Sequence, residues 1–206
     1  VDTSQDFRQQ VLSNRVRRID AVLFTHGHGD HIYGLPDIRS YCRRQGDSID
    51  VYGSQETLDV LHRAFDYIFD PPAYVGGGIP QLCTHLLEGP LEVLGQRIVP
   101  IPVEHGVLVG CQGYRVGDVA YIPDAKVIPP ASLTLLDDLD LLILNCLRLR
   151  PHGSHLCLSE SLAYAEQLRP RRCLFTHMTH DIDYQVEEQH LPEWVRFAYD
   201  GQVVET

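Results

Sequence analysis

The run HGHGDH, from His26 to His31, gathers four side chains that can bind a metal ion within six residues. His26 and His28 are two positions apart on an expected extended turn, so both can point to one side and bind one ion. Asp30 and His31 follow directly and can face a neighbouring point. The two glycines between these ligands remove side chains that would crowd the ions. Imidazole and carboxylate ligands in this mixture suit Zn²⁺, Mn²⁺ or Fe²⁺.

The alternative interpretation of this run is a chance cluster on a histidine-rich surface. The chain has 11 histidines. A pattern of four ligands as tight as this one would still arise by chance in roughly one of a thousand such sequences. We therefore interpret residues 26–31 as part of a metal site.

The elements around the motif predict a chain of α/β or α+β class, because short apolar runs alternate with helical stretches. Strands are expected at residues 19–25, 49–53, 91–93, 97–103, 113–116, 119–122, 139–145 and 173–176. Helices are expected at residues 35–45, ended by Gly46, from an N-cap at Ser54 to about residue 69, and from an N-cap at Ser159 to residue 168. Residues 71–80 hold three prolines and three glycines, which predicts a loop that could cover a site.

Histidine or aspartate follows at the end of several expected strands. The candidates placed in this way are His26, His105, Asp124 and His177. Loops at the ends of buried strands are where a rigid sheet can present convergent ligands. Each residue alone is a weak signal, because a single histidine after a strand is more often an ordinary surface or core residue, and Asp124 after Pro123 would usually be a turn residue.

Four further side chains are candidates for supporting roles. His180 competes with His177 for the role of ligand, and we favour His177 because it follows the strand directly. His155 lies just before an expected helix N-terminus, a place that favours anions, and His152 is its rival in the same loop. Asp2 could orient a ligand histidine from behind.

Composition restricts the function classes. The chain has 206 residues, which suits a single domain, and a net charge of −11. This charge argues against general nucleic-acid binding, which needs clustered Lys and Arg. Six cysteines without a C-x-x-C pair predict buried, reduced thiols in a cytoplasmic protein. No signal peptide or membrane-spanning run is visible, although the chain begins without Met and a preceding segment could carry a targeting signal.

The run THGHGDHIYGL resembles the T-H-x-H-x-D-H-x-x-G signature of the metallo-β-lactamase superfamily. The runs VDTSQDFRQQ, YVGGGIPQL, VEHG, YIPD and LFTHMTHDIDY resemble, in order, a branch that includes the phosphoribosyl cyclic-phosphate phosphodiesterases. This resemblance covers nearly the whole chain. It implies a metallo-β-lactamase four-layer αβ/βα sandwich, with residues 1–206 as one domain that lacks the family's N-terminal strands and glycine-rich loop.

The resemblance also implies a set of ligands for two divalent ions, Zn²⁺ or Mn²⁺, with Fe²⁺ as a further option. The first metal would take His26, His28 and His105, the second would take Asp30, His31 and His177, and Asp124 would bridge both. Asp30 and His155 are the candidate catalytic residues. In related phosphodiesterases, a histidine in the segment of His155 touches the phosphate and aids the leaving group. His180, His152 and Asp2 would contact substrate or support ligands.

The function implied is hydrolysis of a small or cyclic phosphodiester, in which a hydroxide held between the metals attacks phosphorus. No serine or cysteine nucleophile is then needed. Three alternatives remain open: a tRNA 3′-processing endonuclease, a thioester or lactam hydrolase, and a non-catalytic cofactor-biosynthesis binding protein of the same fold. The expected partner is a small phosphodiester rather than nucleic acid or a membrane, and a homodimer is left open.

Overall fold

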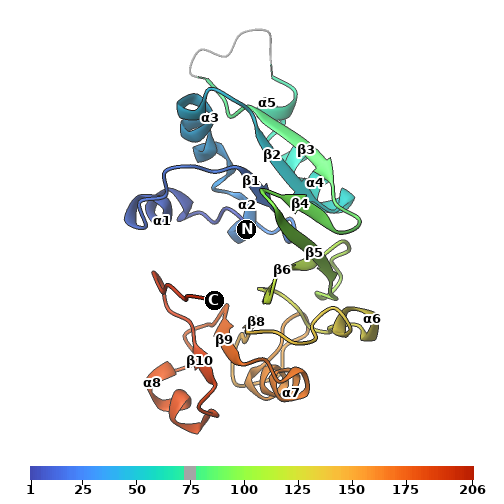
Figure 1. The fold of residues 1–206 in the computed structure, drawn as a ribbon, viewed down its shortest axis with the longest axis vertical. Coiled ribbons are helices and arrows are strands. Elements are labelled where there is room, and N and C mark those ends of the chain that lie inside the picture. Colours follow the sequence, from blue (N-terminus) through green and yellow to red (C-terminus); the bar gives the residue numbers. More distant parts are fainter. Residues whose placement is uncertain (72–77) are drawn as a thin grey trace. The chain divides into compact units, whose positions relative to one another are not determined.

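The computed structural model describes residues 1–71 and 78–206, and the chain divides into two compact units, Val1–Glu88 and Gly89–Thr206. Each unit has its own sheet (Figure 1). Each unit also has its own cluster of buried apolar side chains. The covering loop expected at residues 71–80 lies for the most part outside the described residues. That residues 1–206 act as one domain stays a prediction.

The first unit is built on a parallel three-stranded sheet in the order β1-β2-β3. Its strands are β1 (Ala21–Leu23), β2 (Ile49–Gly53) and β3 (Leu82–Leu86). Its helices are α1 (Phe7–Ser13), α2 (Gly29–Ile32), the 3-10 helix η1 (Leu35–Ile38), α3 (Arg39–Gln45), α4 (Gln55–Ala64) and α5 (Asp66–Phe69). Burial alternates along β2, so one face of this sheet packs on the apolar core of the unit.

Helix ends in the first unit follow local chemistry. The Ser54 hydroxyl accepts a hydrogen bond from the Thr57 amide at 3.2 Å, which confirms the expected N-cap. Gly46 adopts φ 72° and ends α3, also as expected. The single helix expected from Ser54 to residue 69 is wrong, because Phe65 leaves the helical region with ψ 44° and separates α4 from α5.

The second unit holds a seven-stranded sheet in the order β10-β9-β8-β7-β6-β5-β4. Its strands are β4 (Leu91–Val93), β5 (Gln96–Pro102), β6 (Gln112–Val116), β7 (Val119–Ile122), β8 (Leu141–Asn145), β9 (Arg172–Thr176) and β10 (Val195–Phe197). Strands β7 to β10 are parallel, and β6 is antiparallel to both β5 and β7. Therefore β5, β7, β8 and β9 all run in one direction, and their carboxyl ends share one edge of the sheet.

The helices of the second unit are α6 (Pro130–Leu133), α7 (Leu158–Leu168), α8 (Tyr184–Glu187) and the 3-10 helix η2 (Glu188–His190). The expected N-cap at Ser159 is wrong, because α7 begins at Leu158 with Cys157 as its cap. The Glu160 carboxylate accepts a hydrogen bond from the Cys157 amide at 2.9 Å and so completes a capping box. An ion pair of 2.6 Å between Lys126 and Glu160 ties this helix start to the chain after β7.

The thiols fit the sequence expectation with one exception. All six cysteines lie in the described residues and none forms a disulfide, but Cys83 is exposed while the other five are buried. Burial raises the pKa of Cys146 and of Cys173 to about 12, which keeps both thiols protonated. Among the helices of the described residues, none has the length and apolarity needed to cross a membrane.

The core of the second unit can be tested with two leucines. Leu144 on β8 is fully buried, whereas Leu94 is 76% exposed. We expect Leu144→Ala to lower the free energy of unfolding by about 2–5 kcal/mol, because it leaves a cavity in packed surroundings. The control Leu94→Ala should change it by less than about 0.5 kcal/mol. Urea denaturation followed by circular dichroism measures both, and equal effects would contradict the packing described for β8.

Candidate metal centre

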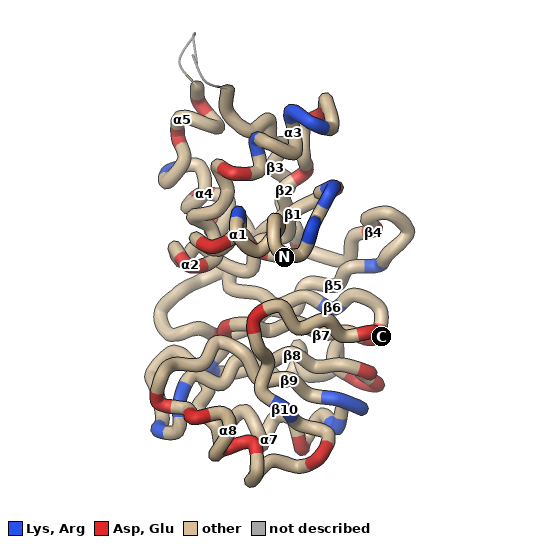
Figure 2. Tube along the Cα trace, turned by 90° about the vertical axis from the view of Figure 1, so that its left-hand side faces the viewer, with Lys and Arg blue, Asp and Glu red and all other residues tan. Residues whose placement is uncertain are grey.

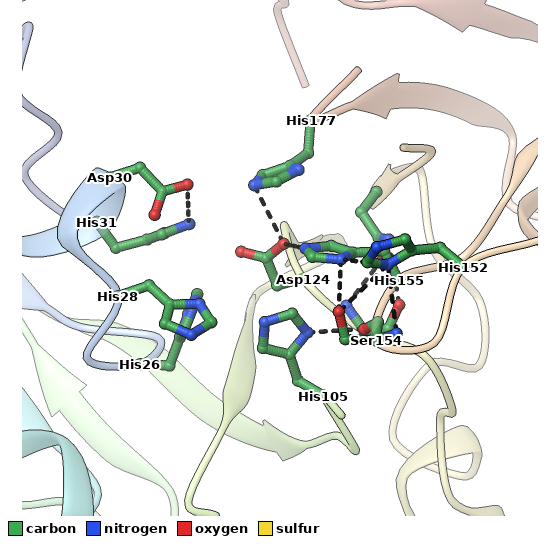
Figure 3. Close-up of polar contacts among 12 residues, drawn as sticks. His26, His28, Asp30, His31, His105, Asp124, His152, Ser154, His155 and His177 are labelled. Atoms are coloured by element: carbon green, nitrogen blue, oxygen red, sulfur yellow. Dashed lines mark hydrogen bonds and ion pairs between the residues drawn. The ribbon is translucent and has the colours of Figure 1, made fainter. Parts of the chain in front are cut away.

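The first ligand group consists of His26, His28, Asp30 and His31 and lies where the chain leaves β1 and enters α2 (Figure 3). His26 and His31 are buried, with 1% and 5% of their surface exposed. The side chain of Asp30 is 53% exposed. Buried imidazoles need hydrogen-bond partners, so the groups behind these two rings determine which nitrogen carries the proton.

Asp2 holds this group from behind. Its Oδ1 accepts a hydrogen bond from the Thr25 amide at 2.8 Å, and its Oδ2 accepts one from the Thr25 hydroxyl at 2.9 Å. The same Oδ2 lies 2.8 Å from His31 Nδ1, and the Thr25 hydroxyl lies 3.0 Å from His26 Nδ1. Both imidazoles are therefore fixed through Nδ1, which leaves Nε2 as the nitrogen that can bind a metal.

The other two members of the group lie against these nitrogens. His28 Nδ1 is 2.9 Å from His26 Nε2, so two ring nitrogens converge on one point. Asp30 Oδ2 is 3.4 Å from His31 Nε2, so a carboxylate oxygen and an imidazole nitrogen converge on another. The distances pair His26 with His28 and Asp30 with His31, and the division of these residues between two metals stays a prediction.

The two glycines of the motif make room for protein side chains. A Cβ on Gly27 would lie 2.8 Å from the side chain of Val60 on α4. A Cβ on Gly29 would lie 2.6 Å from the ring of Tyr33. Sequence reasoning attributed both glycines to crowding around the ions, and these close approaches give each a packing reason of its own.

The second ligand group consists of His105, Asp124, His155 and His177 and belongs to the second unit (Figure 3). His105, Asp124 and His177 follow the carboxyl ends of β5, β7 and β9, which share one edge of the sheet. His155 lies in the loop between β8 and α7. Ligand atoms of His105, Asp124 and His155 all lie within 4.8 Å of one another. Neutral imidazoles and a carboxylate at such spacing fit a divalent ion such as Zn²⁺ or Mn²⁺.

Asp124 is the centre of the second ligand group. It is 3% exposed, and its Oδ1 lies 2.9 Å from His155 Nε2 and 3.2 Å from His177 Nε2. The rings of His155 and His177 stack with centroids 5.0 Å apart. A buried carboxylate is costly unless cations or donors surround it, and this one is surrounded by imidazoles.

Ser154 contacts two histidines of this group, and no spacing pattern in the sequence pointed to it. Its carbonyl oxygen accepts a hydrogen bond from His105 Nδ1 at 2.7 Å, which again leaves Nε2 as the metal-binding nitrogen. Its hydroxyl lies 3.0 Å from His155 Nδ1. A Cβ on Gly106 would lie 2.8 Å from the Ser154 Cβ, so Gly106 permits this close approach of the two loops.

Asn145 holds the loop that carries Asp124, and sequence reasoning assigned it no role. Asn145 ends β8 and is fully buried. Its side-chain oxygen accepts from the Ala125 amide at 3.0 Å, and its side-chain nitrogen donates to the Ala125 carbonyl at 3.1 Å. This double hydrogen bond fixes the residue next to Asp124 to the neighbouring strand.

The geometry separates His177 from His180. His177 adopts φ 60°, in the left-handed region that is uncommon for residues other than glycine, and its ring lies against Asp124. The side chain of His180 is 97% exposed, with Nε2 3.6 Å from Asp181. His177 is thus the better placed of the two to bind a metal.

His152 lies beside His155. The Nδ1 atoms of the two rings are 3.2 Å apart, and the Ser154 hydroxyl lies 3.3 Å from His152 Nδ1. Burial, followed by the nearby charges of His155, Arg148 and Lys126, lowers the pKa of His152 and favours its neutral form. A neutral His152 can accept or donate a hydrogen bond within this loop.

The fold described above is of the α/β class, and its donor sets have ligand types that could bind divalent metal ions. Residues 1–178 match the family model of the β-lactamase superfamily domain. The chain therefore belongs to the β-lactamase superfamily, and the expected metallo-β-lactamase fold is confirmed. The sequence resemblance to the branch that includes the phosphoribosyl cyclic-phosphate phosphodiesterases is also supported, because a solved diphosphatase from the PhnP family is 36% identical. That structure superposes with a TM-score of 0.90 over 100% of this chain and 78% of its own.

The curated relatives that the chain matches are longer than the chain. An octanoyltransferase of Porphyromonas gingivalis is 32% identical over 203 residues, which is 98% of this chain but 41% of that protein. A ribonuclease Z of Bacillus licheniformis is 32% identical over 134 residues, or 62% of this chain and 41% of that protein. The chain thus spans less than half the length of these relatives. A Zn²⁺-bound PqqB of Methylobacterium extorquens, at 19% identity and a TM-score of 0.74, shares the fold.

The support that Asp2 gives to the first ligand group can be measured through metal affinity. We expect Asp2→Ala to weaken binding of Zn²⁺ or Mn²⁺ about 10- to 100-fold, because removing the partner of a ligand histidine frees its orientation. The matched control is Asp6→Ala, since the Asp6 side chain does not cap α1. Isothermal titration of metal into chelator-treated protein measures both variants. An Asp2→Ala affinity equal to that of Asp6→Ala would contradict the role of Asp2.

Proposed function

We propose that the chain is a metal-dependent hydrolase that acts on a small or cyclic phosphodiester and uses two divalent ions, Zn²⁺ or Mn²⁺. The observation that carries the proposal is the way the ligand groups are prepared for metal. His26, His31 and His105 are each held through Nδ1, so that Nε2 remains for a ligand bond. Buried imidazoles arranged in this manner are typical of metal sites rather than of ordinary cores.

The resemblance to the superfamily suggests how the donors are shared. One ion would take His26, His28 and His105, the other would take Asp30, His31 and His177, and Asp124 would bridge them. The ions, when bound, would supply an activated water and stabilise negative charge on the phosphoryl oxygens. The 36% identical diphosphatase supports phosphorus chemistry for this chain.

His155 has the position of a proton donor to the leaving oxygen. Asp124 Oδ1 lies 2.9 Å from its Nε2, and the Ser154 hydroxyl lies 3.0 Å from its Nδ1. A ring held at both nitrogens keeps a fixed orientation and can hold a proton at Nε2 for transfer. Exchange of the Asp124 contact for a substrate oxygen would bring that proton to the departing alkoxide. Asp30, half exposed, would bind a metal and face the substrate side.

Hydrolysis of a thioester is the second candidate function. The observation that favours it is the match of 98% of this chain to part of a protein named octanoyltransferase. A hydrolase joined to an acyltransferase could act on an acyl thioester. The ribonuclease Z relatives raise tRNA processing in the same way, but the net charge of −11 opposes the phosphate contacts that RNA binding needs.

Substrate profiling separates these candidates. Protein purified without chelator would be assayed on bis-p-nitrophenyl phosphate, a five-membered cyclic sugar phosphate, an octanoyl thioester and a tRNA precursor. Turnover of the two phosphodiesters above the other substrates is expected. Faster turnover of the thioester would replace the proposal with the second candidate, and bound metal without turnover of any ester would favour a binding protein.

The role of His155 predicts a dependence on the leaving group. We expect His155→Ala to lower kcat by about 10²- to 10⁴-fold for a diester with an alkyl leaving group, which must be protonated as it departs. The loss should be much smaller for p-nitrophenolate, which leaves without a proton. The matched control is His180→Ala, because that side chain is 97% exposed. Equal losses for both leaving groups would contradict proton donation by His155.

A further inference from the structure

The first unit has a groove with an apolar floor. One wall is formed by α1 and the residues that follow it, and the other wall is formed by α3. The volume of the groove is about 340 Å³. The apolar side chains that line it are Phe7, Val11, Leu12, Val16 and Tyr41. Leu12 is 62% exposed and Val16 is 39% exposed, which leaves apolar surface open to solvent. Exposed apolar surface inside a polar rim is typical of a binding surface.

The rim of the groove is strongly basic in an otherwise acidic chain. Its four cations are Arg8, Arg15, Arg17 and Arg44, and the polar residues Asp37 and Ser40 also line it. Figure 2 shows basic segments in the chain between α1 and β1 and along α3. Within the part of the chain that the structure describes, none of the four arginines forms an ion pair with a carboxylate. Such a rim attracts an acidic partner.

The walls of the groove are tied to each other. The Tyr41 hydroxyl on α3 donates to the Val16 carbonyl at 3.0 Å. Gln45, at the end of α3, donates to the Ile19 carbonyl at 2.8 Å and accepts from the Ile19 amide at 2.9 Å. The segment after α1 is therefore fixed to α3, and an occupant would meet a surface that is already formed.

We propose that this groove binds the acidic segment around α8 and η2 of a second copy of the chain. Residues 181–193 contain five acidic side chains, and the chain has no Lys or Arg from Cys173 to Val195. Within the segment, Tyr184 is 55% exposed and Val186 is 50% exposed. Figure 2 shows the acidic residues that surround α8. The segment offers apolar side chains for the floor and carboxylates for the rim.

The two surfaces complement each other in chemistry as well as in charge. Arginine and tyrosine are enriched at protein interfaces, and a tyrosine inserted into an apolar pocket is a common anchor of binding energy. Guanidinium groups can bind carboxylates with two parallel hydrogen bonds. Each copy of the chain carries both surfaces, so each copy can supply either side of the contact.

Sedimentation velocity over a range of concentrations tests the proposal, with wild-type protein expected to dimerise. Arg8→Glu with Arg17→Glu should weaken the dimer at least about tenfold, because both rim charges become repulsive. Arg63→Glu with Arg97→Glu, at two exposed positions outside the groove, changes net charge equally and should leave dimerisation unchanged. Combining Arg8→Glu and Arg17→Glu with Glu187→Arg and Glu193→Arg should restore the dimer.

Three outcomes would overturn the proposal. A wild-type protein that is monomeric at every concentration would show that the groove does not bind a second copy. A dimer unaffected by Arg8→Glu with Arg17→Glu would place the interface elsewhere. Loss of the dimer without rescue by the charge exchange would exclude the α8–η2 segment as the occupant. Tyr184→Ala gives an independent measure, since it removes the expected anchor without altering charge and should also weaken the dimer.

Discussion

In both units a buried histidine has its Nδ1 held by a neighbouring oxygen, and the candidate metal centre depends on the ring orientation that results. Asp2 lies behind His31, and the Ser154 carbonyl lies behind His105. An imidazole held in this way has one tautomer and one direction, so its Nε2 points to a fixed place. Orientation of this kind lowers the conformational freedom that metal binding would otherwise have to remove.

The fold places most of the candidate ligands just after the ends of its strands. In the second unit, β5, β7 and β9 run in one direction and deliver His105, Asp124 and His177 at one edge. β8 delivers Asn145 there, which fixes the chain beside Asp124. Parallel strands need long connections, and the loop from β8 to α7 brings in Ser154 and His155. In the first unit, β1 leads into His26 in the same manner.

The sequence predicted what depends on local pattern. Strand β2, the Ser54 cap, the Gly46 end of α3 and the placing of ligand types after strands all follow from periodicity or turn chemistry. Ser154 and Asn145 could not be found in this way, since each acts through a hydrogen bond to residues 49 and 20 positions away, respectively. The Ser159 cap was wrong because Glu160 pairs with the backbone of Cys157, a competition that residue type alone does not decide.

We propose that the histidine and aspartate ligands bind two divalent ions per chain. The most direct measurement is elemental analysis by inductively coupled plasma mass spectrometry on protein purified without chelator, for the wild type and for Asp124→Ala. Circular dichroism would establish that the variant is folded. Two metal ions per chain in the wild type and a clear loss in folded Asp124→Ala are expected. A folded wild type with one metal or none, or an Asp124→Ala variant that keeps both ions, would contradict the account.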